Sequence, residues 1–204
     1  MNVTIVDYGA GNLRSVYQAF FLAGADPVTS NDPDVVRRAE RVVLPGVGAA
    51  GAALEALRAR DLDAALDDVR HVGRPILGIC LGLQMMADEV QEFGTHRGLG
   101  WMRGKVARIP SDGNIRVPHM GWSPVDVTER GHDLIGSSAK DRNFYFCHSN
   151  RLYADRDVAA ATVAYGEPFT VAVQFESIFA VQFHPEKSQL AGQRFIKRFL
   201  DWAP

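Results

Sequence analysis

Three short apolar segments, each closed by a glycine-containing turn and followed by a helical pattern, constrain the fold of this chain most strongly. They span residues 3–6, 41–44 and 75–79. A succession of strand, glycine turn, helix and strand is typical of a parallel sheet that is covered by helices. Because sites in such sheets gather at the carboxyl ends of the strands, we expect the three turns to line one crevice.

The helices that follow these turns are expected to begin near Asn12, Ala50 and Leu81. Asn12 is a suitable N-cap for the first helix, whose apolar residues recur at helical spacing. The second helix is predicted over residues 50–70 with a break near Asp61, and the third is predicted over residues 81–89.

The pattern changes after Gly94, where apolar runs follow one another with few helical stretches between them. These runs cover residues 105–109, 144–147, 170–175 and 178–183. They predict added strands, some of them antiparallel, before a last helix that Ser188 is expected to cap. The elements together predict an α/β fold with a mostly parallel central sheet, in a single domain over residues 1–204.

Charge and cysteine content argue against several classes of protein. The formal net charge is −2, with acidic and basic residues scattered, which predicts neither nucleic-acid nor membrane binding. No apolar run approaches the roughly 18 residues that span a bilayer, and the N-terminus lacks the basic start of a signal peptide. Cys80 and Cys147 are too few for a disulfide scaffold, so we expect a cytoplasmic protein with reduced thiols.

Cys80 lies at the centre of a Gly-X-Cys-X-Gly turn between an apolar run and a helix. This is the cysteine counterpart of the nucleophile elbow, in which the glycines allow a sharp turn and keep side chains clear. We predict that Cys80 acts as a thiolate nucleophile and that the N–H of Leu81 helps to hold an oxyanion. The alternative is a small buried cysteine at a strand end, which is the interpretation we favour for Cys147.

His184 and Glu186 close the last predicted strand, with Pro185 between them. Residues two apart in an extended chain point to the same side, so Glu186 is expected to accept a hydrogen bond from one nitrogen of His184. The other nitrogen would then take the proton of Cys80. The alternative is a solvated pair at a strand end. Gln84, one helical turn after Cys80, is expected to reach a substrate that lies over the sulfur.

These motifs together resemble the class I, triad-type glutamine amidotransferases. The matching segments are residues 45–48, 78–84 and 182–186, which occur in the order of the family. The resemblance implies a three-layer α/β/α fold, with Cys80 as nucleophile, His184 as base and Glu186 as the residue that orients the base. It also implies glutamine contacts from Gln84, Glu92 and Ser149. We further predict that the N–H groups of Val47 and Leu81 hold the oxyanion and that Gly46 contacts the substrate. The resemblance implies no metal and no cofactor.

Four further segments resemble one branch of this family, the glutaminase subunits of imidazole glycerol phosphate synthases. They are residues 7–15, 118–122, 144–149 and 184–188. The branch implies a (β/α)₈-barrel cyclase as the partner in a heterodimer, which uses the ammonia in histidine biosynthesis. Asn12, Trp122 and Lys187 fall in segments that would face this partner.

Two residues depart from the pattern of the family. Ala50 stands where phenylalanine is usual, which puts the packing beneath the 45–48 loop in question, and Asn150 stands where an aromatic residue often follows His-Ser. Three other functions stay open at this point. They are a glutaminase of another amidotransferase branch, a cysteine peptidase on a related sheet, and a catalytically inactive binding partner.

Overall fold

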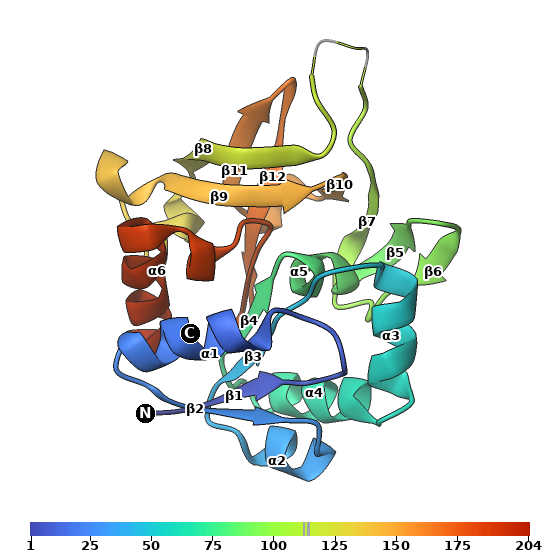
Figure 1. The fold of residues 1–204 in the computed structure, drawn as a ribbon, viewed down its shortest axis with the longest axis vertical. Coiled ribbons are helices and arrows are strands. Elements are labelled where there is room, and N and C mark those ends of the chain that lie inside the picture. The colour runs from blue at the N-terminus through green and yellow to red at the C-terminus, as the bar shows by residue number, and fades with distance from the viewer. Residues whose placement is uncertain (112, 114) are drawn as a thin grey trace.

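The computed structural model describes residues 1–111, 113 and 115–204, and its main feature is a nine-stranded mixed sheet (Figure 1). The first five strands across the sheet are parallel, and the remaining strands pair antiparallel. The order is β2 (Asp26–Ser30), β1 (Asn2–Val6), β3 (Val42–Leu44), β4 (Ile76–Ile79), β13 (Ile178–Val181), β12 (Glu167–Phe175), β11 (Ala159–Tyr165), β8 (His119–Val127) and β9 (Asn143–His148).

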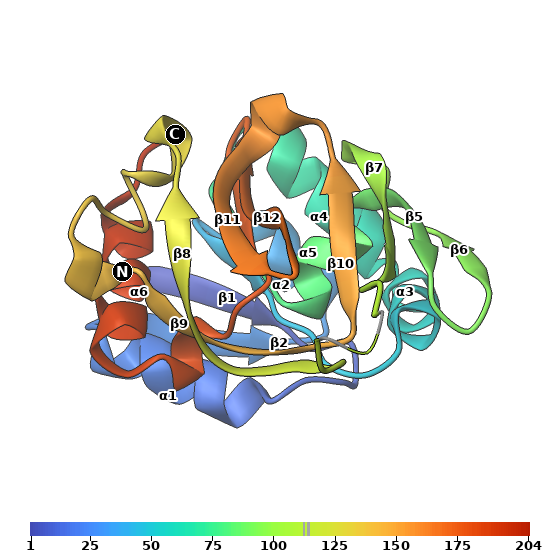
Figure 2. The same ribbon diagram turned by 90° about the horizontal axis from the view of Figure 1, so that it is seen from above.

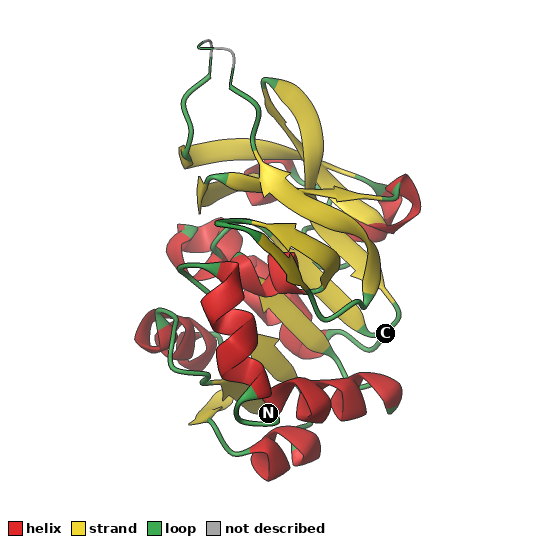
Figure 3. Ribbon diagram, turned by 90° about the vertical axis from the view of Figure 1, so that its right-hand side faces the viewer, coloured by secondary structure: helices red, strands yellow, loops and turns green. Residues whose placement is uncertain are grey.

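Helices cover both faces of the parallel part of this sheet (Figures 1 and 3). One face carries α1 (Leu13–Leu22) and α6 (Gln189–Asp201), and the other carries α2 (Pro33–Arg38), α3 (Ala50–Arg58), α4 (Leu62–His71) and α5 (Leu81–Met85). Val43 belongs to the first apolar core, whereas Val42 and Leu44 belong to the second. Strands buried on both faces read as continuous apolar runs, and the predicted three-layer α/β/α fold is confirmed.

A second sheet of four strands lies beside the antiparallel part of the first (Figure 2). Its order is β10 (Asn150–Ala154), β7 (Met102–Arg108), β5 (Ala87–Gln91) and β6 (Thr95–Arg97). Short 3₁₀ helices complete the described structure, at Glu129–Gly131, Ala139–Asp141, Arg156–Val158 and Pro185–Lys187. Within the described chain, none of the helices has the length and apolar character needed to cross a membrane.

The predicted break near Asp61 is confirmed, because this residue has a left-handed φ of 54° between α3 and α4. The helix predicted over residues 81–89 is wrong in its second half. It ends at Met85, and residues 87–91 form β5, which pairs with β6 and β7. Pairing with two neighbouring strands outweighs the helical pattern of this short segment.

Asn12 and Ser188 occupy the predicted N-cap positions of α1 and α6, but neither side chain makes a capping bond to the residues that the structure describes. The hydroxyl of Ser188 instead donates to the carbonyl of His184 at 2.6 Å and accepts from the N–H of Tyr145 at 2.9 Å. Ser188 therefore ties β9 to the segment that carries His184.

Candidate active site

Cys80 occupies a sharp bend between β4 and α5. Its φ of 53° and ψ of −104° form a conformation that residues with side chains rarely adopt, at a cost of about 1–3 kcal/mol. The neighbouring strand holds this bend, because the N–H of Cys80 donates a 2.7 Å hydrogen bond to the carbonyl of Val181. The bend turns the side chain of Cys80 into a cavity at the carboxyl end of the parallel strands.

The two glycines of the motif provide space rather than an unusual backbone conformation. The positive φ belongs to Cys80 itself, and not to Gly78 or Gly82. A Cβ on Gly82 would collide with the carbonyl oxygen of Leu44, and one on Gly78 would lie 2.7 Å from the Cε of Met86. The glycines thus allow the sharp turn, as predicted, because they leave room for neighbouring groups to approach the bend closely.

His184 reaches the same cavity from the end of β13, which pairs in parallel with β4. Val181 lies opposite Ile79 in this pairing, so the segments that leave the two strands start side by side. The N–H of His184 donates a 2.9 Å hydrogen bond to the carbonyl of Tyr145. Sheet register therefore brings together two residues that are far apart in the sequence.

Glu186 contacts the ring of His184, but by a different backbone route from the predicted one. Oε1 of Glu186 lies 2.8 Å from Nδ1 of His184, and both side chains are buried. The prediction of an extended chain here is wrong, because Pro185–Lys187 forms a 3₁₀ turn that brings the carboxylate back to the ring. Since a carboxylate accepts, Nδ1 carries the hydrogen and Nε2 is the nitrogen left for Cys80.

The charge state of His184 follows from these contacts. Burial on its own would lower the pKa of His184, but hydrogen bonds to Cys80 and Glu186, together with their negative charges, outweigh it and raise the pKa to about 10. At neutral pH the imidazole therefore holds a proton between a sulfur and a carboxylate, which is the arrangement that a reactive thiolate requires.

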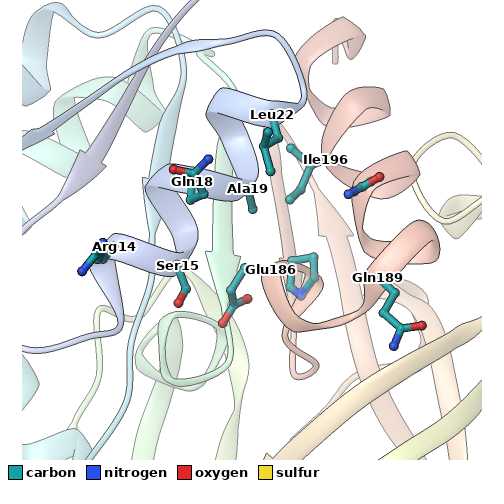
Figure 4. Close-up of a pocket in the computed structure, with 10 residues that line it drawn as sticks. Arg14, Ser15, Gln18, Ala19, Leu22, Glu186, Gln189 and Ile196 are labelled. Carbon is teal, nitrogen blue, oxygen red and sulfur yellow. The ribbon is translucent and has the colours of Figure 1, made fainter.

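Behind the imidazole, the second oxygen of Glu186 is buried and has no hydrogen-bond partner among the described residues. Glu186 also lines a separate cavity of about 450 Å³ between α1 and α6, where Figure 4 shows Ser15 beside the carboxylate. The carboxylate is therefore held by His184 on one side and bordered by a separate cavity on the other.

The cavity in front of Cys80 has a volume of about 330 Å³ and gathers most of the residues predicted for the site. From the predicted set, its lining contains Val47, Cys80, Leu81, Gln84, Glu92, Ser149, His184 and Lys187. The structure thus places these groups around one space large enough for a small amino acid.

Gly46, predicted to contact the substrate, is not among the described residues that line this cavity, but it packs against Leu81, which is one of them. A Cβ at this position would stand 2.7 Å from both the Cβ of Leu81 and the hydroxyl oxygen of Tyr8. That hydroxyl donates a 3.0 Å hydrogen bond to the carbonyl of Pro45. The turn after β1 therefore supports the turn after β3 from below. The expectation that all three turns line one crevice is wrong, since the described cavity lining takes residues from the second and third turns only.

Gln84 is part of a buried chain of amides rather than a residue on a helix surface. Its Nε2 donates to Oε1 of Gln182 at 2.9 Å and to the carbonyl of Asn150 at 3.3 Å. Nε2 of Gln182 in turn lies 3.5 Å from Sγ of Cys80. Gln182 belongs to the motif that carries His184, but the sequence alone gave it no role.

Glu92 is fixed by the two residues that depart from the family pattern. Its Oε2 accepts from the N–H of Ala50 at 2.7 Å, and its Oε1 accepts from Nδ2 of Asn150 at 2.7 Å. Ala50 is fully buried, so a small residue completes the packing beneath this loop. Asn150 is buried as well, and its polar side chain takes the position of an aromatic one in order to hold Glu92 at the cavity.

A pair of buried histidines adjoins the site and was not predicted from the sequence. Nδ1 of His148 faces the carbonyl of Asn150 at 2.8 Å, and its Nε2 lies 3.1 Å from Nδ1 of His119. Nε2 of His119 is 2.8 Å from the hydroxyl of Ser123. Because a carbonyl only accepts, each Nδ1 carries the hydrogen and each Nε2 accepts. Burial lowers the pKa of His119 and of His148 to about 4, so both rings are neutral at pH 7.

We expect these two histidines to make the stability of the protein sensitive to acid. The unfolded chain binds their protons near pH 6.5, and the folded chain binds them only near pH 4. Their contribution to stability is therefore complete above pH 6.5 and is lost as pH falls toward 4. We expect the free energy of unfolding, measured by urea denaturation, to fall by about 2 kcal/mol or more between pH 7 and 4.5.

The control for this prediction is a double variant, His119→Asn with His148→Asn, which should lose less stability over the same interval even if it is less stable throughout. Replacing the exposed His132 by asparagine should leave the slope unchanged. An unaltered slope in the double variant would show that other groups cause the acid sensitivity.

The residues predicted to face a partner all reach the surface of the described structure. Asn12 is exposed at the start of α1, and Trp122 is half exposed on β8. The ring of Tyr145 lies 6.1 Å from that of Trp122 and 5.9 Å from Nζ of Lys187, which also lines the cavity. Trp122 and Lys187 therefore both contact Tyr145, and Lys187 connects this surface to the cavity.

Comparison with known proteins gives matches along nearly the whole chain. The family model described as glutamine amidotransferase class-I matches residues 4–202. The chain is 46% identical to the imidazole glycerol phosphate synthase subunit HisH of Zymomonas mobilis, across 99% of this chain and 96% of the relative. It is also 46% identical to the same subunit of Rhodopirellula baltica, across 97% and 96%. A solved glutamine amidotransferase has the same fold, with a TM-score of 0.72 and 17% identity over 98% of this chain and 97% of that chain.

Proposed function

Because this chain belongs to the class-I glutamine amidotransferase family, we propose that it is the glutaminase subunit of an imidazole glycerol phosphate synthase. It hydrolyses glutamine to glutamate and ammonia. The resemblance to this family in the sequence motifs is confirmed by the relatives, which are about as long as this chain. The observation that carries the activity is one cavity lined by Cys80 and by the His184 ring, whose far side is bonded to Glu186.

In the proposed reaction, the thiolate of Cys80 attacks the side-chain amide carbon of glutamine. The imidazolium of His184 gives its proton to the leaving ammonia, and the glutamyl thioester remains on the sulfur. His184 then takes a proton from water, whose oxygen attacks the thioester carbon. Glutamate leaves, and the sulfur is free for the next substrate. Glu186 stabilises the imidazolium in both steps.

The negative charge that develops on the amide oxygen of glutamine must be stabilised by hydrogen-bond donors. The N–H groups of Val47 and Leu81 are the proposed pair, because both residues line the cavity on either side of Cys80. Gly46 permits this arrangement, since any side chain there would separate the two segments. Each such donor contributes about 2.7–4 kcal/mol to stabilisation of the transition state.

The polar end of glutamine requires groups farther from the sulfur. The carboxylate of Glu92 is suited to the α-ammonium group, and its two hydrogen bonds to Ala50 and Asn150 fix its position. The backbone around Gly46 and Ser149 and the side chain of Gln84 supply the remaining proposed contacts. Both hydrogens of the Gln84 amide are already used within the protein, so its Oε1 is the atom it can offer.

The relatives are named as synthase subunits, and we propose that this chain likewise works with a partner. The proposed partner is a (β/α)₈-barrel cyclase that binds near Asn12, Trp122 and Lys187 and receives the ammonia. Partner binding would bias the peptide between Gly46 and Val47 toward the form that points an N–H at the oxyanion. Both cysteines are free thiols, which fits a reducing compartment, so the proposed location is the cytoplasm.

The test is glutamine hydrolysis by the purified chain, measured with and without a barrel cyclase and its ribonucleotide substrate. We expect hydrolysis to be slow for the chain alone and much faster in the complex, with imidazole glycerol phosphate as a product. Equal rates with and without the cyclase would contradict the proposed control. If the rate of glutamine hydrolysis did not respond to the cyclase but rose with the synthase of another pathway, the chain would belong to a different branch of the amidotransferase family.

A further inference from the structure

A buried amide touches the sulfur of the proposed nucleophile. Gln182 is 1% exposed, and its Nε2 lies 3.5 Å from Sγ of Cys80. Sheet register explains this contact. Val181 pairs with Ile79 in the parallel sheet, so the residues that follow them, Gln182 and Cys80, lie side by side. The N–H of Gln182 also donates to the carbonyl of Val171 at 2.8 Å, which fixes its backbone from the opposite side.

The end of the Gln182 amide that faces the sulfur is determined by a main-chain carbonyl. The carbonyl of Asn150 can only accept, so the amide of Gln84 must turn its NH₂ group toward it. The second hydrogen of that NH₂ group then meets Oε1 of Gln182. Gln182 therefore presents its own NH₂ group to Cys80. The carbonyl of Asn150 also accepts a hydrogen bond from Nδ1 of His148. It is therefore an acceptor in both of these contacts, with His148 and with Gln84.

We propose that Gln182 is a further catalytic residue, which donates a hydrogen bond to the thiolate of Cys80 and stabilises its negative charge before attack. The role of Gln182 in turnover rests on the proposed function, whereas its contact with Cys80 does not. His184 receives the thiol proton on one side of the sulfur, and Gln182 donates on another. A neutral amide is suited to this position, because it stabilises the anion and does not itself titrate.

The amides of Gln84 and Gln182 thus have separate tasks. Gln182 touches the sulfur, whereas Gln84 is a positioning residue that keeps the donor end of Gln182 toward it. Without Gln84, the Gln182 amide could turn its oxygen to the sulfur, where it would repel the thiolate. Removal of either residue should therefore act in the same direction, with the larger effect from Gln182.

The experiment measures alkylation of Cys80 by iodoacetamide as a function of pH, followed by mass spectrometry of the labelled peptides. This readout does not depend on any glutaminase activity. Gln182→Met removes the donor and keeps a similar volume, and Gln84→Met removes the group that orients it. Gln174→Met, on the adjacent strand β12, is the matched control. The second thiol, Cys147, reports in every sample whether the fold has changed.

We expect the pH of half-maximal Cys80 alkylation to rise by about one to two pH units in Gln182→Met, because a hydrogen bond to a charged acceptor contributes this much. Gln84→Met should give a smaller rise, Gln174→Met none, and the profile of Cys147 should not move. A midpoint that is unchanged in both Gln182→Met and Gln84→Met would overturn the proposal. If Gln182→Met does not fold, Gln84→Met decides it alone.

Glutamine hydrolysis by the complex separates this inference from the proposed function. A raised alkylation midpoint in Gln182→Met, with wild-type protein inactive toward glutamine, would support the contact and refute the glutaminase. An unchanged midpoint in Gln182→Met, with wild-type protein active toward glutamine, would refute the role of Gln182 and support the glutaminase. If both ideas hold, the kcat of Gln182→Met at neutral pH should fall by about 10- to 100-fold, and raising the pH should restore part of it.

Discussion

Replacing Cys80 with alanine is expected to abolish glutamine-dependent product formation while ammonia-dependent formation by the complex persists. The structure places this sulfur at a strained bend, in the cavity that the His184 ring also lines. Loss of the nucleophile from a covalent triad lowers kcat by about a millionfold, which is below detection for most assays. Supplying ammonium salt should bypass this step, because ammonia is all that the proposed cyclase partner would take from this chain.

The matched control for this prediction is Cys147→Ala. Cys147 lines the same cavity and is half-buried rather than packed in the core as predicted, but it lies within β9 and not at a helix start, so glutamine-dependent turnover should survive its replacement. Both activities should be measured on the same preparation of the complex. If Cys80→Ala lost ammonia-dependent turnover to the same extent, the residue would be required for assembly rather than for the attack on glutamine.

Replacing Glu186 with glutamine should lower kcat for glutamine by about 10²- to 10⁴-fold with little change in KM. The amide oxygen can still accept from Nδ1 of His184, so the ring keeps its orientation. The negative charge is lost, however, and that charge is one of the causes that raise the pKa of His184. The imidazolium that donates to the leaving ammonia is then less stable.

The pH profile distinguishes this electrostatic effect from simple damage to the structure. Because the pKa of His184 falls in Glu186→Gln, the imidazole loses its proton at a lower pH, and the basic limb of the kcat profile should move toward neutrality. Glu176→Gln makes the same chemical change in an exposed ion pair with Arg70 and should leave the profile unchanged. A reduced kcat with an unmoved basic limb would contradict the role assigned to Glu186.

The parts of the site that could be predicted are those whose signals are local in sequence. The Gly-X-Cys-X-Gly turn specifies a strand, a bend and a helix within five residues, and the structure contains all three. The pairing of His184 with Glu186 was predicted for the wrong backbone conformation, because a short 3₁₀ turn leaves no pattern distinct from a strand end. The catalytic roles of these residues, in contrast to their placement, stay predictions.

The network behind the site could not be predicted, because its bonds join residues that are distant in sequence. Asn150 meets Glu92 across 58 positions, and Gln182 meets Gln84 across 98. Nothing local marks an asparagine in β10 as the partner of a carboxylate after β5. The second sheet was missed for the same reason, since β5 becomes a strand through pairing with β6 and β7 and not through its own sequence.

The place of β13 in the sheet has a consequence for how the molecule becomes active during its synthesis. Among the strands that the structure describes, this one is the last to leave the ribosome, yet it lies between β4 and β12. Until residues 178–181 arrive, the parallel and antiparallel halves have no strand to join them. The same strand delivers His184 to Cys80. Insertion of one late segment therefore completes the sheet and the proposed triad together, and we expect a chain that still lacks this segment not to consume glutamine.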